Sequence, residues 1–407
     1  MKKTIIALAA VVLLGAASAR NANAAGFRLP DENAAALGMA NAFSAQSDDA
    51  SAVWYNPAAM TGLTGTQTML GSTFIHPLMN HENPDGTSDT SDAPWHTQPH
   101  AFATHNFGNF SLGLGITVPF GLSSGWAGDA ETARAATYSS IKVINYNLAG
   151  AYKFSDALSA AVGLDYATID ASLYNTGSAL QGSPNVKLDG TGNGVGANAA
   201  IFYKASPKLN LAASYRTRMK MSVNGTVSVT GGLASLALYS NAATSVVLPD
   251  VLLVGASYKA TEKLRLNFDV DYTGWSSYDQ LNINADNSAL TSIQYKNWNN
   301  VVAFRIGGEY DLNDMWKVRA GYMNDATPVP DNRFEPRIPD ATRNGYSAGV
   351  GFKKGDWTVD ASYLYLHFND RTVTNSLGSS LATVDTTLNG TWKSSANLFG
   401  LSVGYKF

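Results

Sequence analysis

The stretch Leu264-Arg-Leu-Asn-Phe-Asp-Val-Asp-Tyr-Thr273 decides the fold class. Apolar residues occupy every second position from Leu264 to Tyr272, and polar residues fill the positions between them. Because successive side chains of a β-strand point to opposite faces, the pattern predicts a strand with one apolar and one polar face. The C-terminal stretch 399–407 shows the same alternation, as do 316–322 and 357–363.

Fourteen such segments follow one another between residue 65 and the C-terminus, and they are connected alternately by tight turns and by longer polar loops. Aromatic residues lie near the ends of many segments. Alternation, aromatic ends and short turns opposite long loops predict an all-β protein, a 14-stranded antiparallel transmembrane β-barrel of the bacterial outer membrane. A β-sandwich would explain the alternation, but not the strand lengths or the asymmetry of the connections. The segments are expected near 66–76, 97–107, 109–119, 138–154, 157–174, 193–205, 208–224, 246–260, 263–283, 292–312, 315–325, 343–354, 357–373 and 392–407.

The composition excludes several other classes of protein. Only 14% of the 407 residues are charged, against roughly a quarter in an average soluble protein, and the mean hydropathy is -0.09. No long apolar run outside the N-terminus could form a transmembrane helix. A net charge of -3 without runs of Lys or Arg argues against nucleic acid as a partner. The chain has no Cys, which rules out disulfides and thiolate chemistry.

The N-terminal 64 residues divide into two parts. Residues 1–24 have the features of a signal peptide: a basic start at Lys2 and Lys3, an apolar stretch over 5–17 and a small-residue cleavage site ending at Ala24. Residues 25–64 lack strand alternation. A fourteen-stranded barrel is wide enough to leave a channel, so we interpret 25–64 as a plug, or hatch, inside a barrel formed by 65–407.

The motifs of the chain resemble the FadL family of outer-membrane transporters for long-chain fatty acids and other hydrophobic compounds. The resemblance covers the whole mature chain and implies a hatch-closed barrel in which the ligand enters between the outer loops and leaves sideways through the wall. The motifs that carry it are Ala25-Gly26-Phe27, Leu37-Gly38, Asp48-Asp49-Ala50, Asn56-Pro57-Ala58, Leu248-Pro249-Asp250, Tyr272-Thr273-Gly274-Trp275-Ser276, Pro328-Val329-Pro330 with Arg333, Ile338-Pro339-Asp340 with Arg343, and the terminal Phe407.

The resemblance also implies a lateral gate at a kink in the third strand. In this chain the gate would be Val118, Pro119, Phe120, Gly121 and Leu122. Proline removes a hydrogen-bond donor from the ladder and glycine tolerates unusual backbone angles, as a break in pairing requires. The alternative is that Pro119 merely ends the strand before an outer loop.

Two parts of the hatch are candidate site residues because they resemble the family. Phe27 corresponds to a hatch residue that reaches the internal pocket, whereas a free N-terminal tail would be disordered. Asn56, Pro57 and Ala58 form the hatch motif, which we expect to make a turn that positions the hatch against the kinked strand.

Four cations are candidate ligands for a carboxylate. If Leu209, Leu211, Ala213, Tyr215 and Met219 face lipid, then Arg216, Arg218 and Lys220 face the lumen, and Arg305 is inward by its own register. The alternative is that these cations neutralise the lumenal acids Asp269, Asp271 and Glu309. The loop 226–247 carries several apolar residues and is expected to form a small capture patch.

These observations favour passive, hatch-gated uptake of long-chain fatty acids or related hydrophobic molecules by a protein that is not an enzyme and needs no cofactor. The alternatives are uptake of monoaromatic hydrocarbons, a structural or adhesion barrel, and a lipid hydrolase. His76–His81 with Glu82 lack the spacing of a metal site, so we expect none. The expected partners are the hydrophobic ligand, outer-membrane lipid and lipopolysaccharide, and the barrel assembly machinery through Phe407. The protein is expected to be a monomer.

Overall fold

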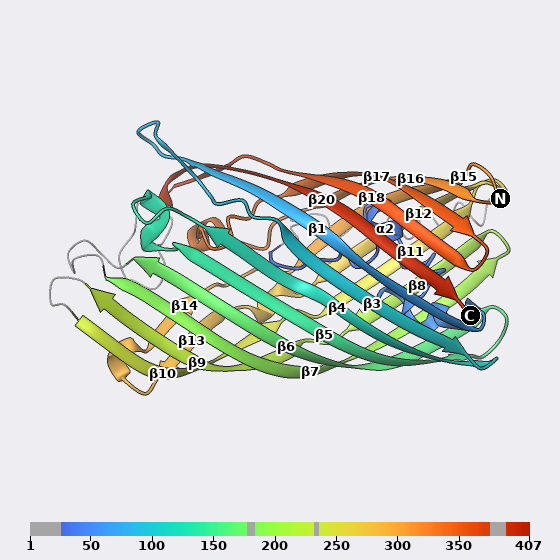
Figure 1. Cartoon of the computed structure of the whole chain (residues 1–407), viewed down its shortest axis with the longest axis horizontal. Coiled ribbons are helices and arrows are strands. Elements are labelled where there is room, and N and C mark those ends of the chain that lie inside the picture. Colours follow the sequence, from blue (N-terminus) through green and yellow to red (C-terminus); the bar gives the residue numbers. More distant parts are fainter. Residues whose placement is uncertain (1–25, 177–183, 232–235, 375–387) are drawn as a thin grey trace.

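A computed structural model describes residues 26–176, 184–231, 236–374 and 388–407. The signal peptide predicted at 1–24 lies outside these residues. Long antiparallel strands form one closed wall around a small helical segment near the N-terminus (Figure 1). The predicted all-β fold is confirmed.

The wall is a closed barrel of 14 strands, several of which are interrupted and bear two labels. Closure is direct, because β1 pairs with β3 on one side and with the last strand, β20, on the other. The short β2 (Ser88–Thr90) extends the β1 hairpin. The barrel strands are β1 (Thr66–Glu82), β3 (His96–Asn106), β4 (Phe110–Gly125), β5 (Tyr138–Lys153), β6 (Leu158–Thr176), β7 (Asn185–Ser206), β8 (Leu209–Arg216) with β9 (Met219–Gly231), β10 (Leu236–Leu248) with β11 (Val251–Lys259), β12 (Leu264–Thr273) with β13 (Gln280–Ala285), β14 (Ser292–Tyr295) with β15 (Val301–Asp311), β16 (Trp316–Asp325), β17 (Arg343–Lys354), β18 (Trp357–Phe368) with β19 (Arg371–Val373), and β20 (Gly390–Lys406).

The alternation of the sequence becomes the two faces of the wall. On β6, Val162 and Leu164 point outward and are 71% and 67% exposed, whereas Asp165 between outward neighbours is buried on the lumenal side. Apolar side chains can be left on the outer face only where lipid covers them, and inward polar side chains find partners in the lumen. This division explains the low content of charged residues.

The connections differ between the two ends of the barrel. At the end where the C-terminus lies, tight turns join β3 to β4, β5 to β6 and β17 to β18. Longer segments at the other end contain the 3-10 helices η3 (Glu131–Arg134), η5 (Trp275–Ser277), η6 (Ser288–Leu290) and η7 (Asp331–Arg333). The segment 226–247, expected to be a loop, instead belongs largely to β9 and β10, which pair from Met219 to Gly231. Cross-strand pairing continues along both strands, so the described part of this segment is not the expected loop, and residues 232–235 lie outside the described residues. The capture patch stays a prediction.

The hatch lies inside the barrel and consists of α2 (Ala34–Leu37), α3 (Ala52–Tyr55) and η2 (Pro57–Gly62). Asn33 caps α2, because its Oδ1 accepts a hydrogen bond from the Ala35 N–H at 2.7 Å. Most hatch residues from Asp31 onward are buried. None of the helices in the described ranges is long and apolar enough to cross a membrane.

The hatch backbone sits directly on glycines of the wall. A Cβ on Gly307 would lie 2.6 Å from Met39 Cβ, and one on Gly321 would lie 2.6 Å from Ala40 N. Ala40 has a φ of 51° and donates its N–H to Ser347 Oγ at 2.9 Å. The glycines therefore allow a tight hatch turn to approach the wall more closely than any side chain would permit.

Candidate functional site

The wall has a gap between β3 and β4. Their pairing runs from Asn106–Ser111 only as far as Ala101–Ile116, although β3 begins five residues earlier, at His96. On its other edge β4 shifts register between Thr117 and Phe120, where it carries one residue more than β5. This bulge bends β4 away from β3 at the predicted gate.

Hatch residues take the place of the missing strand partner. The Leu29 N–H donates to Pro119 O at 2.8 Å, and the Gly121 N–H donates to Phe27 O at 2.9 Å. Arg28 and Phe120 thus form an isolated antiparallel bridge. Pro119 has no N–H group and uses only its carbonyl in this bridge. The break in the ladder therefore leaves no backbone donor of Pro119 unpaired. The predicted kink is present, and a hatch segment occupies its open edge.

Two side chains satisfy the remaining backbone groups of the bulge. The Val118 N–H donates to Glu32 Oε1 at 2.8 Å, and Gln98 Nε2 donates to Val118 O at 3.1 Å. Glu32 is completely buried, and burial raises the pKa of its carboxyl well above the usual range. The bulge is therefore held by β3, through Gln98, and by the hatch, through Glu32.

Phe27 is buried in an aromatic cluster on the lumenal side of the gate. Its ring centroid lies 4.7 Å from that of Trp275, 5.8 Å from those of Tyr278 and Trp298, and 5.9 Å from that of Phe120. Such edge-to-face contacts hold aromatic rings at defined angles. The start of the described chain is therefore packed between the kinked strand and the outer segments, instead of forming a free tail.

An outer segment closes over this cluster. Residues 326–342, which connect β16 to β17, reach across to β4, where Ser124 Oγ donates to Arg337 O at 3.2 Å, and to Trp126, whose Nε1 donates to Pro336 O at 3.0 Å. In the same segment Asp340 accepts the Gly26 N–H at 3.1 Å and the Thr327 hydroxyl at 2.6 Å. The outer segment and the first residues of the hatch are thus joined.

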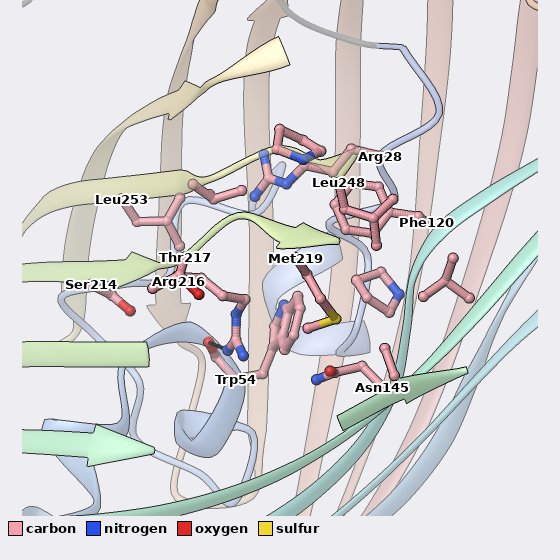
Figure 2. A pocket seen from close by; sticks show the side chains of 15 residues that line it. Arg28, Trp54, Phe120, Asn145, Ser214, Arg216, Thr217, Met219, Leu248 and Leu253 are labelled. Carbon is pink, nitrogen blue, oxygen red and sulfur yellow. Dashed lines mark hydrogen bonds between the residues drawn. The ribbon is translucent and has the colours of Figure 1, made fainter. Parts of the chain in front are cut away.

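A small apolar cavity of about 40 Å³ lies against the hatch, behind the gate (Figure 2). Its lining includes Phe120, Met219 and Leu248, together with Trp54 of α3. Arg216 also points into it, with its guanidinium 4.1 Å above the Trp54 ring and hydrogen-bonded to Asp165. The cavity is mostly apolar, and its two arginines, Arg28 and Arg216, are each paired with an aspartate, a composition typical of sites for hydrophobic ligands.

A larger cavity, of about 510 Å³, passes through the gap in the wall. Its inner lining includes Arg28, Leu29 and Asp340, while Trp95 and Tyr138 at its outer end are 56% and 40% exposed. The same cavity therefore touches the hatch, the predicted gate and the outer surface of the barrel.

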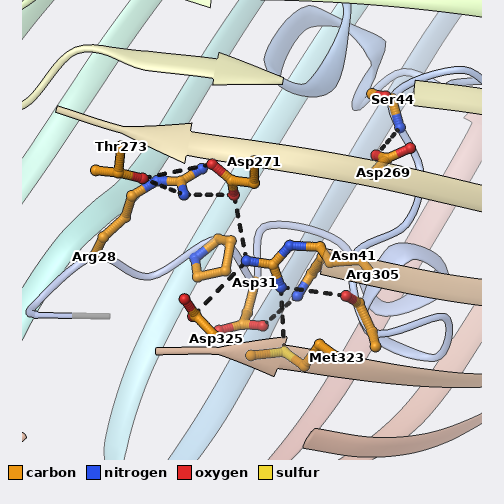
Figure 3. A network of polar contacts seen from close by, with 12 residues as sticks. Arg28, Asp31, Asn41, Ser44, Asp269, Asp271, Thr273, Arg305, Met323 and Asp325 are labelled. Carbon is orange, nitrogen blue, oxygen red and sulfur yellow. Dashed lines mark hydrogen bonds and ion pairs between the residues drawn. The ribbon is translucent and has the colours of Figure 1, made fainter. Parts of the chain in front are cut away.

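Ion pairs fix the inner arginines (Figure 3). Arg28 Nη1 lies 2.6 Å from Asp271 Oδ2, and Arg305 Nη2 lies 3.3 Å from the same oxygen. Arg343 Nη2 lies 2.8 Å from Asp325 Oδ2, which is also 3.9 Å from Arg305. Since each of these three arginines is paired with an aspartate, the network anchors the hatch residue Arg28 to the wall.

The structure supports only part of the predicted row of lumenal cations. Arg216 and Arg305 point inward, but each is bound to an aspartate, as the alternative interpretation expected. Arg218 is half exposed and pairs with Asp250, and Lys220 is exposed. The predicted inward orientation of Arg218 and Lys220 is therefore wrong.

The physical reason is a break between β8 and β9. Arg216 lies opposite Asn198 and Ser222 opposite Asn193, so this strand has one residue more than β7 over the same span. One extra residue exchanges the two faces of a strand. Met219 and Met221 consequently point inward instead of the cations.

The hatch motif binds β7 and begins a 3-10 helix that contacts the kinked strand β4. Asn56 Oδ1 accepts the Ala58 N–H at 3.0 Å and begins η2, whose first residue is Pro57. Asn56 Nδ2 donates to Ile201 O of β7 at 3.1 Å. The motif forms the predicted turn. Its hydrogen bond anchors the hatch to β7, η2 accepts a hydrogen bond from Ser111 Oγ of β4 at Met60 O, and residues 27–32 hold the kink itself.

Sequence reasoning missed Arg28, Glu32 and Trp298. Arg28 and Glu32 lie close to Phe27, but nothing in their spacing indicates which wall residues they meet. Trp298 follows β14 in an outer connection, where only the tertiary structure brings it to Phe27. Among the described residues no group of three or more His, Cys, Asp or Glu side chains is placed to hold a metal ion.

Comparisons with known proteins agree with this geometry. Residues 15–407 match the family model described as outer membrane protein transport protein (OMPP1/FadL/TodX). The chain is 27% identical to outer membrane protein P1 of Haemophilus influenzae, with 100% of both chains covered. It is 24% identical to the long-chain fatty acid transport protein of Salmonella typhi, over 90% of this chain and 93% of that one. A crystal structure of a Pseudomonas aeruginosa FadL homologue superposes with a TM-score of 0.84 at 20% identity, covering 94% of this chain and 100% of the other. With its barrel, internal hatch and apolar cavities, the chain belongs to the OMPP1/FadL/TodX family of outer membrane transport proteins.

Proposed function

We propose that the protein carries long-chain fatty acids or related hydrophobic molecules across the outer membrane by passive, hatch-gated diffusion, with lateral release through the gap between β3 and β4. The observation that carries the proposal is the 510 Å³ cavity, which is lined by hatch residues at one end and by the exposed Trp95 and Tyr138 at the other. A ligand that leaves by this route enters lipid without crossing an aqueous layer.

The small cavity and the aromatic cluster supply the inner part of the route. Phe27 contacts Trp275 and Trp298 as well as the gate residue Phe120, and Phe120 itself meets the Trp275 ring edge-on at a centroid distance of 6.0 Å. Displacing residues 27–29 would break the hydrogen bonds from the Leu29 N–H to Pro119 O and from the Gly121 N–H to Phe27 O, and so connect the two cavities. Each of those bonds contributes about 1 kcal/mol, a barrier that a bound apolar ligand could offset by burying its own surface.

A second candidate function is the uptake of uncharged hydrocarbons, and one observation on the arginines of the cavities supports it. The arginines that line the inner ends of the cavities, Arg28, Arg216 and Arg343, are each bound to an aspartate. A carboxylate would have to compete with an existing acid for each of them, whereas a neutral ligand would not.

The test is uptake of labelled oleate and labelled toluene by cells that lack their own transporter and express this chain. We expect expression to raise oleate uptake. If neither rate rises, transport is refuted; if toluene alone responds, the second candidate is correct.

A deletion variant tests the lateral release route separately. Deleting Pro119 removes the extra residue of the bulge and allows β4 to pair regularly with both neighbours. We expect uptake to fall to the background of cells without the protein, while the folded barrel retains its altered electrophoretic mobility before heating. Full uptake by an assembled deletion variant would place the exit elsewhere.

A further inference from the structure

The outer end of the large cavity carries a cation that the inner ion pairs do not include. Lys142 lies on β5, opposite the gate residue Gly121, and lines the cavity with an exposed side chain. Tyr138, on the same face four residues earlier, is also exposed and lines the same cavity. Lys142 thus lies where the gap opens to the outer surface.

Lys142 differs from the arginines at the inner end. Arg28 lies 2.6 Å from Asp271, and Arg343 lies 2.8 Å from Asp325. No ion pair or hydrogen bond of the Lys142 ammonium occurs within the described ranges, although Asp170 is its cross-strand neighbour on β6. Lys142 therefore has its charge available to a ligand.

The surroundings of Lys142 suit the headgroup of an amphiphile. A lysine on a lipid-facing wall extends its apolar stem along the surface and keeps its ammonium near the polar layer. Trp95, stacked on His76 with ring centroids 4.8 Å apart, supplies an aromatic side to the same opening. An apolar chain can lie in the cavity while a headgroup oxygen meets the ammonium.

We propose that Lys142 is a specificity residue at the exit, an inference that rests on the proposed function. Lys142 binds the carboxylate of an emerging anionic amphiphile. It therefore favours carboxylates over neutral molecules of the same chain length. A phosphate of lipopolysaccharide has the same anionic oxygen chemistry and could reach Lys142 from outside. The emerging ligand is favoured because Lys142 lines the cavity itself.

The experiment compares oleate with oleyl alcohol, which has the same chain but no charge. Purified protein is reconstituted in phospholipid vesicles with and without lipopolysaccharide, and transfer of each ligand through wild type, Lys142→Met and Lys142→Arg is measured. Because an exposed ion pair contributes up to about 1 kcal/mol, we expect Lys142→Met to slow oleate transfer roughly three- to fivefold, with oleyl alcohol unchanged and Lys142→Arg close to wild type.

Lys187→Met is the matched control. Lys187 is an exposed lysine on β7 that lies over the Tyr174 ring and does not line the cavity, so its loss should leave both rates unchanged. Electrophoretic mobility before heating confirms assembly of each variant.

The outcomes separate the two levels of the proposal. If wild type transfers neither ligand, the proposed function fails. If wild type transfers oleate and Lys142→Met is equally fast, or slows both ligands alike, the role of Lys142 is refuted. An effect that requires lipopolysaccharide in the vesicles and is the same for both ligands would assign Lys142 to the lipid and also overturn the proposal.

Discussion

Replacing Gly321 by alanine should loosen the hatch without disturbing the barrel. A Cβ at this position would lie 2.6 Å from Ala40 N and closer still to the carbonyl carbon of Met39. Ordinary contacts between heavy atoms lie at about 3.5–4.0 Å, so the hatch backbone would have to retreat by about 1 Å. Both atoms belong to the backbone, so no side-chain rotation can relieve the clash.

The energetic effect follows from the contacts at this turn. Overpacking of this kind costs about 1–3 kcal/mol, which corresponds to a rise of roughly 5- to 150-fold in the population of displaced hatch. Retreat of the hatch would also stretch the hydrogen bond from the Ala40 N–H to Ser347 Oγ, now 2.9 Å long. We therefore expect the variant barrel to conduct ions frequently where the wild type conducts rarely.

The assay is single-channel conductance in planar bilayers, supported by sensitivity of cells to a large hydrophilic antibiotic. Gly308→Ala is the matched control, because it lies on the neighbouring strand and its Cβ would meet Leu266 Cδ2 at 3.6 Å, an ordinary contact. If assembled Gly321→Ala barrels conduct no more than Gly308→Ala barrels, the hatch is not held by its close approach to the wall glycines.

Two further predictions concern buried carboxyls at the gate and the outer segment. Glu32→Ala leaves the Val118 N–H without its acceptor, at a cost of about 1–3 kcal/mol, and should alter oleate transfer. Glu32→Gln keeps an acceptor and should behave as wild type. Equal transfer by the two variants would show that this hydrogen bond does not hold the bulge. Burial raises the pKa of Asp340 from its ordinary 3.8 to about 6, so the folded state is favoured by protonation, and stability that is complete below pH 4 is lost as the pH rises through 6. Unfolding in denaturant should show Asp340→Asn matching wild type at pH 4 but exceeding it at pH 8 by about 3 kcal/mol at most; a constant difference across this range would contradict the assignment.

Much of the architecture could be predicted from local pattern. The alternation at Leu264–Thr273 defines a strand with two faces, and the structure places those residues in β12. The Pro119 and Gly121 pair correctly indicated a break in pairing, because each residue has a property that a regular ladder does not tolerate. Such features depend only on neighbours in the sequence.

The errors arose where one residue changes the register. Arg218 and Lys220 were assigned to the lumen by extending the alternation of β8, and the extra residue at the β8–β9 break reversed it. The alternation has a period of two, so a single bulge that leaves no sequence signal inverts every later side chain of that strand.

The sequence by itself determined the class of the protein: an exported chain whose alternating strands require lipid on one face and a filled lumen on the other. Only the tertiary structure decided how the lumen is filled and which charges are available. Arg28, Arg216 and Arg305 are neutralised by aspartates distant in the chain, and Glu32 meets Val118 across 86 residues. Closure of the barrel brings such residues together, and sequence separation carries no information about contacts that depend on closure.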